Sequence, residues 1–188
     1  TSVASEASNS VTPSTAIAIA IGDFYQGGVV FYLFVEGETG YVAGETHGLI
    51  AAVQDQSSGI RWYNGSSTTT GATGTAIGTG ATNTTTIIDE QGDTETSYAA
   101  GLARAYTGGG YSDWFLPSKD ELNKMYTNRA TINTTATSNS GSSFSTNNYY
   151  WSSTELGVNA AWLQSFSNGN QYSSSKGFTY NVRAVRAF

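Results

Sequence analysis

Few residues of this 188-residue chain could carry nucleophilic or metal chemistry. It has one histidine, His47, and no cysteine. A Ser-His-Asp triad would have to use His47, which lies in a predicted turn before a strand, and no G-x-S-x-G nucleophile motif is present. One imidazole without thiolates also falls short of the ligand set of a zinc site. The sequence therefore argues against a serine hydrolase, a cysteine enzyme and a zinc enzyme.

Paired carboxylates are the remaining catalytic option, because glycosidases place two acids around the scissile bond. Asp120 and Glu121 fall in the first turn of a predicted helix, where negative charge interacts favourably with the helix dipole. Glu155 follows a predicted buried strand, and we expect it to form a structural ion pair with Arg183 or Arg186. We interpret all the acids as structural and keep a carboxylate-dependent glycosidase as a distant alternative. The other candidates are Asp89, Glu90, Asp93, Glu95 and Asp113.

Two further segments have residues that cofactor sites use. Residues 89–93 have the acid density of a loose calcium loop but not the D-x-[DN]-x-[DN]-G order, so calcium is only weakly supported. Residues 71–80 repeat Gly and Thr, but no lysine follows and no strand-to-helix context surrounds them, which excludes a phosphate loop. We therefore expect no cofactor.

The last third of the chain is rich in tyrosine, asparagine, serine and glycine. These types dominate antibody paratopes, because tyrosine gives rigid contact area and the small polar residues give adaptable hydrogen bonds. Aromatic rings beside amides also suit sugar binding. The alternative, weighed equally, is a polar β surface without a ligand. We predict a ligand site at a hairpin tip and on the strand returning from it, formed by Asn168, Asn170, Gln171, Tyr172 and Tyr180.

The composition favours a secreted or cell-surface protein. Charged residues make up 12% of the chain, against roughly 25% in ordinary soluble domains. The net charge is -6 and no basic stripe exists, which argues against a nucleic-acid partner. No apolar run reaches the roughly 18 residues of a membrane span. The start lacks the basic and apolar parts of a signal peptide, so residue 1 of an exported protein would be a mature end or a cut boundary.

The firmest local prediction covers residues 110–122. Trp114–Leu116 is a compact apolar run typical of a buried strand, and Pro117 ends it. Ser118 and Glu121 then fit the S-x-x-E capping box, so we predict a helix over 118–130.

The remaining segments predict one α+β domain, antiparallel and β-rich, with two helices. Residues 96–106 form the other predicted helix. Residues 66–86 and 133–148 read as loops with little helix, and Asn168-Gly169 as a type I′ hairpin turn. Strands are predicted over 16–21, 28–35, 49–53, 60–63, 149–153, 160–167 and 178–188.

Six segments follow one another in a characteristic order: Gly22–Tyr32, Gly48–Ala52, Tyr111–Leu122, Tyr150–Glu155, Ala161–Trp162 and Val182–Phe188. In this order they resemble the C-terminal domain family of Legionella collagen-like adhesins, over residues 22–188. The resemblance implies an extracellular bacterial or phage module, a variant of the C-type-lectin-like fold, used for surface attachment. We therefore expect a non-catalytic adhesin or lectin-like module that recognises a glycan or another cell-surface ligand.

The rival hypothesis is a structural subunit of an extracellular fibre or homo-oligomer. We divide the chain into an N-terminal extension, 1–21, and the adhesin-type domain, 22–188. In the extension Ile17, Ile19 and Ile21 alternate with alanine, which suits addition of a strand to an exposed sheet edge. That edge belongs either to the same chain or to a neighbouring subunit, and we favour the neighbour.

Overall fold

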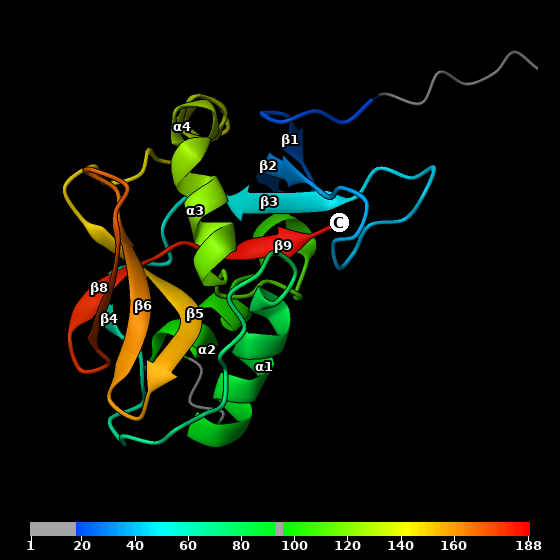
Figure 1. Cartoon of the computed structure of the whole chain (residues 1–188). Coiled ribbons are helices and arrows are strands. Elements are labelled where there is room, and N and C mark those ends of the chain that lie inside the picture. The colour runs from blue at the N-terminus through cyan, green and yellow to red at the C-terminus, as the bar shows by residue number, and fades with distance from the viewer. Residues whose placement is uncertain (1–17, 93–95) are drawn as a thin grey trace, which may run out of the picture.

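Two β-sheets and four α-helices form the part of the chain that the computed structural model describes, residues 18–92 and 96–188 (Figure 1). The first sheet is antiparallel, in the order β1-β2-β3-β9. Its strands are β1 (Phe24–Tyr25), β2 (Gly28–Leu33), β3 (Gly48–Ala52) and β9 (Val185–Ala187).

The second sheet has the order β4-β8-β5-β6-β7, in which β5 and β8 run parallel and the other neighbours antiparallel. The strand β8 lies between β4 and β5, so the order of the strands in the sheet differs from their order in the sequence. The strands are β4 (Ser57–Arg61), β5 (Tyr149–Gly157), β6 (Ala160–Ser165), β7 (Gln171–Ser175) and β8 (Thr179–Val182).

The helices lie between and beside the sheets. In Figure 1, α1 and α2 run below β9, whereas α4 lies near β2. The helix α3 packs on β5 and β6 and so supports one face of the second sheet. The helices are α1 (Gly80–Gln91), α2 (Ala99–Ala105), α3 (Lys119–Thr127) and α4 (Arg129–Ser138), with a short 3-10 turn at Gly108–Gly110.

The α+β class is confirmed, but two helices were missed in the predicted loops. In α1, Asn83 fixes the neighbouring loop, donating to Gly74 O at 2.7 Å and accepting from Gly74 N at 3.1 Å. In α4, Ile132 and Ala136 are buried, and the Thr135 hydroxyl donates to Gly22 O at 2.7 Å. Both helices are rich in Thr, which has modest helix propensity, so tertiary contacts decide their conformation.

The capping box is confirmed. Ser118 Oγ accepts from Glu121 N at 3.3 Å, and Glu121 Oε2 accepts from Ser118 N at 2.7 Å. The predicted helix is nevertheless split, since α3 ends at Thr127 and α4 starts at Arg129. The predicted strand Trp114–Leu116 is reduced to one bridge, Phe115 to Val185.

The closing strand and the predicted type I′ turn also differ from expectation. The segment 178–188 is broken at Arg183–Ala184, where the chain passes from the second sheet to the first. The turn between β6 and β7 spans five residues, 166–170. Only Gly169 has positive φ (82°), so the turn is not type I′. A Cβ at Gly169 would lie 2.3 Å from the Tyr126 ring, which explains why glycine is needed there.

The predicted N-terminal strand is wrong over the residues that can be compared. Residues 18–21 form no strand, and Asp23 closes a turn by accepting from Ala20 N at 2.8 Å. The residues 16 and 17 lie outside the described part of the chain. Within residues 18–92 and 96–188, no helix is long and apolar enough to cross a bilayer.

Candidate binding site

The second sheet carries an aromatic hollow on the face away from α3. Its lining comes from four adjacent strands: Tyr180 on β8, Tyr149 on β5, Leu163 on β6 and Tyr172 on β7. We call it the tyrosine hollow. Its volume is about 210 Å³, and Ser173 and Ser174 complete its lining.

The three tyrosine rings meet at steep angles. The Tyr149 ring centroid lies 6.2 Å from that of Tyr172 and 5.5 Å from that of Tyr180, with interplanar angles of 75° and 65°. Tyr180 in turn packs edge-on against the buried Trp151. Tyr149 and Tyr172 remain 39% and 42% exposed, whereas Leu163 at the base is 2% exposed. The hollow is therefore an apolar floor with accessible aromatic walls.

Hydrogen bonds hold these walls in place. Ser174 and Tyr180 share a hydroxyl–hydroxyl hydrogen bond of 3.1 Å, although their strands are separated by β5 and β6, so the sheet curls. The Tyr172 hydroxyl accepts from Asn170 Nδ2 at 3.1 Å. Asn168 Oδ1 accepts from Asn170 N at 3.0 Å within the turn. Tyr172 is thus positioned by the hairpin tip.

A second, polar hollow adjoins the first. It shares Tyr149 and Tyr180 with the tyrosine hollow and has a volume of about 250 Å³. We call it the amide hollow, because asparagine side chains form much of its lining. Its other lining residues are Ser58, Asn147, Asn148, Thr179 and Asn181.

Most of the predicted ligand residues are brought together. Tyr172 and Tyr180 line one hollow, with Asn170 bonded to Tyr172 and Asn168 bracing the turn. Gln171 is apart from them: its Nε2 donates to Lys119 O at 2.8 Å, on the α3 side of the sheet. Successive strand residues face opposite sides, which explains this separation.

Sequence reasoning missed Tyr149 as a site residue. Tyr149 contacts both predicted tyrosines and lies in the same tyrosine- and asparagine-rich third of the chain. Composition alone could have included it. The crossover that places β8 beside β5, and hence Tyr180 beside Tyr149, has no signal in the sequence.

The expected partner of Glu155 is wrong. Its carboxylate pairs with Lys176, and both side chains are buried. Thr70 N donates to the two carboxylate oxygens at 2.9 and 3.0 Å, and Gly71 N donates at 2.9 Å. Burial acts to raise the pKa of Glu155, but the hydrogen bonds from Lys176, Thr70 and Gly71 outweigh it and lower this pKa below its usual range.

The two arginines have other partners. Arg183 Nε donates to Asp55 Oδ1 at 2.6 Å, and Arg186 pairs with Asp113. Both pairs connect distant parts of the chain, and none of their four residues lines the tyrosine hollow. The sequence placed Arg183 and Arg186 correctly in a closing segment, but lacked the information to choose among acids.

Glu121 is a second buried carboxylate, and it has no cationic partner among the described residues. Oε1 accepts from Gly78 N at 2.8 Å and Gly80 N at 3.4 Å, while Oε2 accepts from Ser118 N. Burial raises the pKa of Glu121 to about 7, and these hydrogen bonds oppose the rise without cancelling it. Its role is to fix the loop before α1 to the start of α3.

His47 has one local and one long-range contact, and the segment weighed for calcium lies partly in α1. His47 Nε2 lies 2.7 Å from Glu45 Oε2, and Nδ1 lies 3.0 Å from Phe188 O. The hydrogen bond to Glu45 raises the pKa of His47. Asp89 and Glu90 belong to α1, and Asp93 lies outside the described residues. Within the described ranges no three His, Cys, Asp or Glu side chains cluster as metal ligands do.

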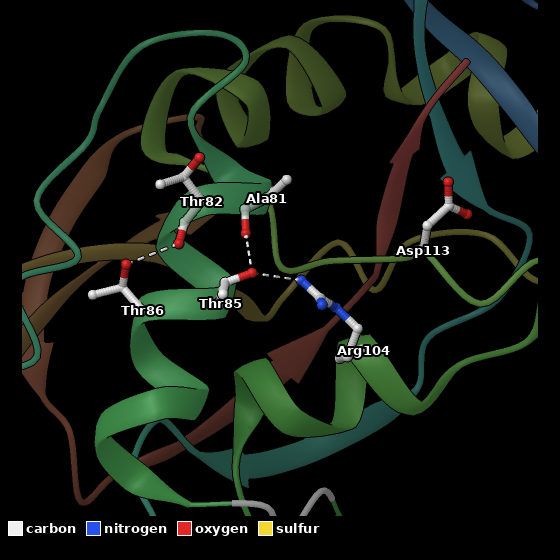
Figure 2. Close-up of a pocket in the computed structure, with 6 residues that line it drawn as sticks. All are labelled: Ala81, Thr82, Thr85, Thr86, Arg104 and Asp113. Atoms are coloured by element: carbon white, nitrogen blue, oxygen red, sulfur yellow. Dashed lines mark hydrogen bonds between the residues drawn. The ribbon is translucent and has the colours of Figure 1, made fainter.

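A larger hollow of about 370 Å³ lies beside α1 and α2 (Figure 2). Arg104 from α2 is the cationic residue of the lining. Arg104 Nε donates to Trp114 O at 3.1 Å, and Arg104 Nη2 donates to Thr85 Oγ1 at 3.2 Å. Asp113 is the acid in this lining, and it pairs with Arg186. Both charged groups thus have structural partners. The full lining is Ala81, Thr82, Thr85, Thr86, Arg104 and Asp113.

Another hollow, of about 460 Å³, lies at the edge of the first sheet beside β1. Ile19, Asp23, Phe24 and Tyr25 line it. Of the predicted assembly residues, Ile19 packs on the core of its own chain and Ile21 is 46% exposed, whereas Ile17 lies outside the described part. Phe24 is 49% exposed, so this edge presents apolar surface.

Comparison with known proteins gives first the fold and then the family. The structure is similar to the crystal structure of a fimbrial protein from Bacteroides ovatus ATCC 8483, with a TM-score of 0.60 and 16% sequence identity. The likeness covers 84% of this chain and 43% of that chain, so this chain spans less than half of the fimbrial protein. At this identity the likeness concerns the fold alone.

The chain belongs to the Lcl C-terminal domain family, whose sequence model matches residues 51–186. This membership confirms the resemblance found in the sequence, although the match starts after the first of the six segments. It also supports the coarser expectation of an extracellular adhesin or fibre-related module. Among curated proteins, none matches the chain.

Proposed function

We propose that this domain is a non-catalytic extracellular binding module that recognises a glycan through the tyrosine hollow. The observation that carries the proposal is the meeting of Tyr149, Tyr172 and Tyr180 at an accessible hollow beside asparagine side chains. The Lcl C-terminal domain family and the fimbrial fold neighbour support an adhesin-type role outside the cell.

The chemistry of the two hollows suits a sugar. The C–H faces of a pyranose ring pack on aromatic rings, and its hydroxyls exchange hydrogen bonds with amides and serine hydroxyls. Tyr172 lies on the edge strand β7 with much of its ring exposed, so its ring adds little to the core. Two rings this exposed in one hollow favour a surface that a ligand covers.

The carboxylates support a non-catalytic role. A glycosidase needs two acids around one bond, and none of the four hollows described above is lined by two carboxylates from residues 18–92 and 96–188. Glu121 and Glu155 are buried and bound by backbone N–H groups of a loop. Among the residues that the structure describes, no geometry therefore supports the carboxylate-dependent glycosidase.

Replacement of Tyr172 by alanine tests the proposal. A glycan array probed with the wild-type domain would first identify a bound glycan. We expect Tyr172→Ala to weaken its binding at least about tenfold, because an aromatic ring that stacks on the sugar in a small site carries much of the affinity. The melting temperature should stay nearly unchanged, since the ring is 42% exposed.

The matched control is Tyr41→Ala, which removes a tyrosine of similar exposure, 38%, from the loop between β2 and β3. It should bind like the wild type. The proposal is wrong if no glycan binds the folded wild-type domain, or if both tyrosine variants bind it equally.

A structural subunit of a fibre or homo-oligomer is the second candidate. The specific observation is the edge strand β1 with its adjoining hollow and the exposed Phe24. An edge strand with apolar neighbours can accept a strand from another copy. The fimbrial fold neighbour supports this candidate too.

Two variants test assembly by light scattering. Removal of residues 1–17 takes away most of the N-terminal extension, including Ile17, but leaves Ile19, which packs on its own core. Phe24→Lys instead places a charge on the acceptor edge. Each should leave a folded monomer if the wild-type protein assembles, and unchanged assembly in both would contradict this second candidate.

A further inference from the structure

The tyrosine hollow and the amide hollow are two halves of one larger surface. They share the walls Tyr149 and Tyr180. Their volumes, about 210 and 250 Å³, each fall below the roughly 300–1,000 Å³ of ordinary ligand sites, whereas together they fall within that range. A ligand that fills the surface would therefore extend across the two shared tyrosines.

The amide hollow has a fixed hydrogen-bond polarity. The carboxylate of Asp55 can only accept, so the Asn181 group that faces it at 3.1 Å is the Nδ2 donor. Asn181 Oδ1 then accepts from Asn148 Nδ2 at 3.3 Å. This series of hydrogen bonds leaves Asn148 Oδ1 as an acceptor without a donor among the described residues. A sugar hydroxyl could supply that donor.

The linings of the two hollows contain no charged side chain from the described part of the chain. The acid bonded to Asn181 is Asp55, and the charge of Asp55 is paired with Arg183. The whole chain carries a net charge of -6. An acidic or sulfated polymer would meet no cation in the lining of either hollow, and the net negative charge of the protein would disfavour its approach.

We propose that the two hollows are adjoining subsites for an uncharged glycan chain of at least two sugar units. One unit packs among Tyr149, Tyr172 and Tyr180, and the next donates a hydroxyl to Asn148 Oδ1. The inference rests on the proposed glycan-binding function, and it adds the length and charge of the ligand. The steep angles between the rings give walls instead of a flat platform, which suits a single soluble chain more than a crystalline surface.

Calorimetry with neutral oligosaccharides of increasing length tests the inference. The probes are cello-, manno-, galacto- and chito-oligosaccharides of one to six units, with heparin as the acidic polymer. For the series that binds, we expect at least about a tenfold gain in affinity from one unit to two or three, then a plateau, because two subsites contribute. Heparin should bind at least about tenfold more weakly than the best neutral chain.

The variants Tyr172→Ala and Asn148→Ala separate the subsites. Asn148→Ala should keep the wild-type affinity for the single sugar and lose the gain with length, whereas Tyr172→Ala should weaken binding of every length. Equal binding of one and three units would overturn the two-subsite inference and leave the glycan proposal standing. Tighter, salt-dependent binding of heparin would overturn the uncharged ligand. Binding of none of these glycans, with a folded domain, would reject the proposed function itself.

Discussion

Two buried carboxylates hold opposite ends of the same loop in different ways. The loop is the Gly- and Thr-rich segment 70–80 before and at the start of α1. Glu155 accepts from Thr70 and Gly71 at its beginning, and Lys176 balances the charge of Glu155. Glu121 accepts from Gly78 and Gly80 at its end, with no cation beside it. The pKa of Glu155 is lowered, whereas the pKa of Glu121 is raised to about 7.

At Glu121 the hydrogen bonds from backbone N–H groups do not outweigh the effect of burial on the pKa. Both acids have several such donors and both are fully or almost fully buried. Glu155 has the lysine that Glu121 lacks, and a nearby opposite charge favours the ionised form whereas burial favours the neutral one. The same loop is therefore anchored by an ion pair at one end and by an acid that titrates near neutral pH at the other.

The largest effect is expected from removal of the lysine. Lys176→Met leaves Glu155 buried without its cation and also removes the hydrogen bond from Nζ to Thr68 O, 2.9 Å. Breaking one partner of a buried pair costs about 3–5 kcal/mol. We expect a loss of this size in the free energy of unfolding, measured by denaturant titration with tryptophan fluorescence.

Two controls sharpen this result. Lys119→Met removes a lysine that lies 3.7 Å from the Trp162 ring centroid but has no carboxylate partner among the described residues, and it should cost about 1 kcal/mol or less. Adding Glu155→Gln to Lys176→Met neutralises the orphaned charge and should restore much of the loss. If the double variant is no more stable than Lys176→Met, the ion pair is not what stabilises this end of the loop.

The contrast between the two acids marks how far sequence reasoning reaches. Ser118 and Glu121 are three residues apart, so the capping box and the start of α3 follow from local spacing. The Glu155–Lys176 pair spans 21 residues and the Glu155–Thr70 contact spans 85. The choice of Lys176 over Arg183 or Arg186 depends on strand order, which no local pattern encodes.

The helices and the site repeat this lesson. α2 has apolar periodicity and was predicted, whereas α1 is a Thr-rich helix held by Asn83 and Thr84. The Thr84 hydroxyl accepts from Leu116 N at 3.0 Å. Composition predicted Tyr172 and Tyr180 as ligand residues. Their meeting with Tyr149 depends on the β5–β8 crossover. The α+β class was predictable because most strands have local apolar patterns. Whether the fold is a C-type-lectin-like variant stays a prediction.

The smaller expected effect is the dependence of stability on pH. Glu121 has a folded pKa of about 7 and a usual value of 4.5, so the folded state binds an extra proton between these pH values. The free energy of unfolding should therefore fall as pH rises from about 4.5 to about 7, on the order of 3 kcal/mol in all. Glu155, with its lowered pKa, has the opposite sign: its contribution is present above pH 4.5 and is lost as pH falls below that value. Together the two acids predict maximal stability near pH 4.5 to 5.

Denaturant titrations from pH 3.5 to 8 measure this curve, and Glu121→Gln separates its two limbs. The variant cannot titrate at this position, so the fall between pH 4.5 and 7 should disappear while the loss below pH 4.5 remains. His47 has a raised pKa from Glu45 and also loses stabilisation as pH rises, above its usual value of 6.5. A His47→Gln control removes that contribution. If the wild-type curve stays flat from pH 4.5 to 7, the hydrogen bonds from Gly78, Gly80 and Ser118 suffice to keep Glu121 ionised. The two carboxylates would then differ only in their partners.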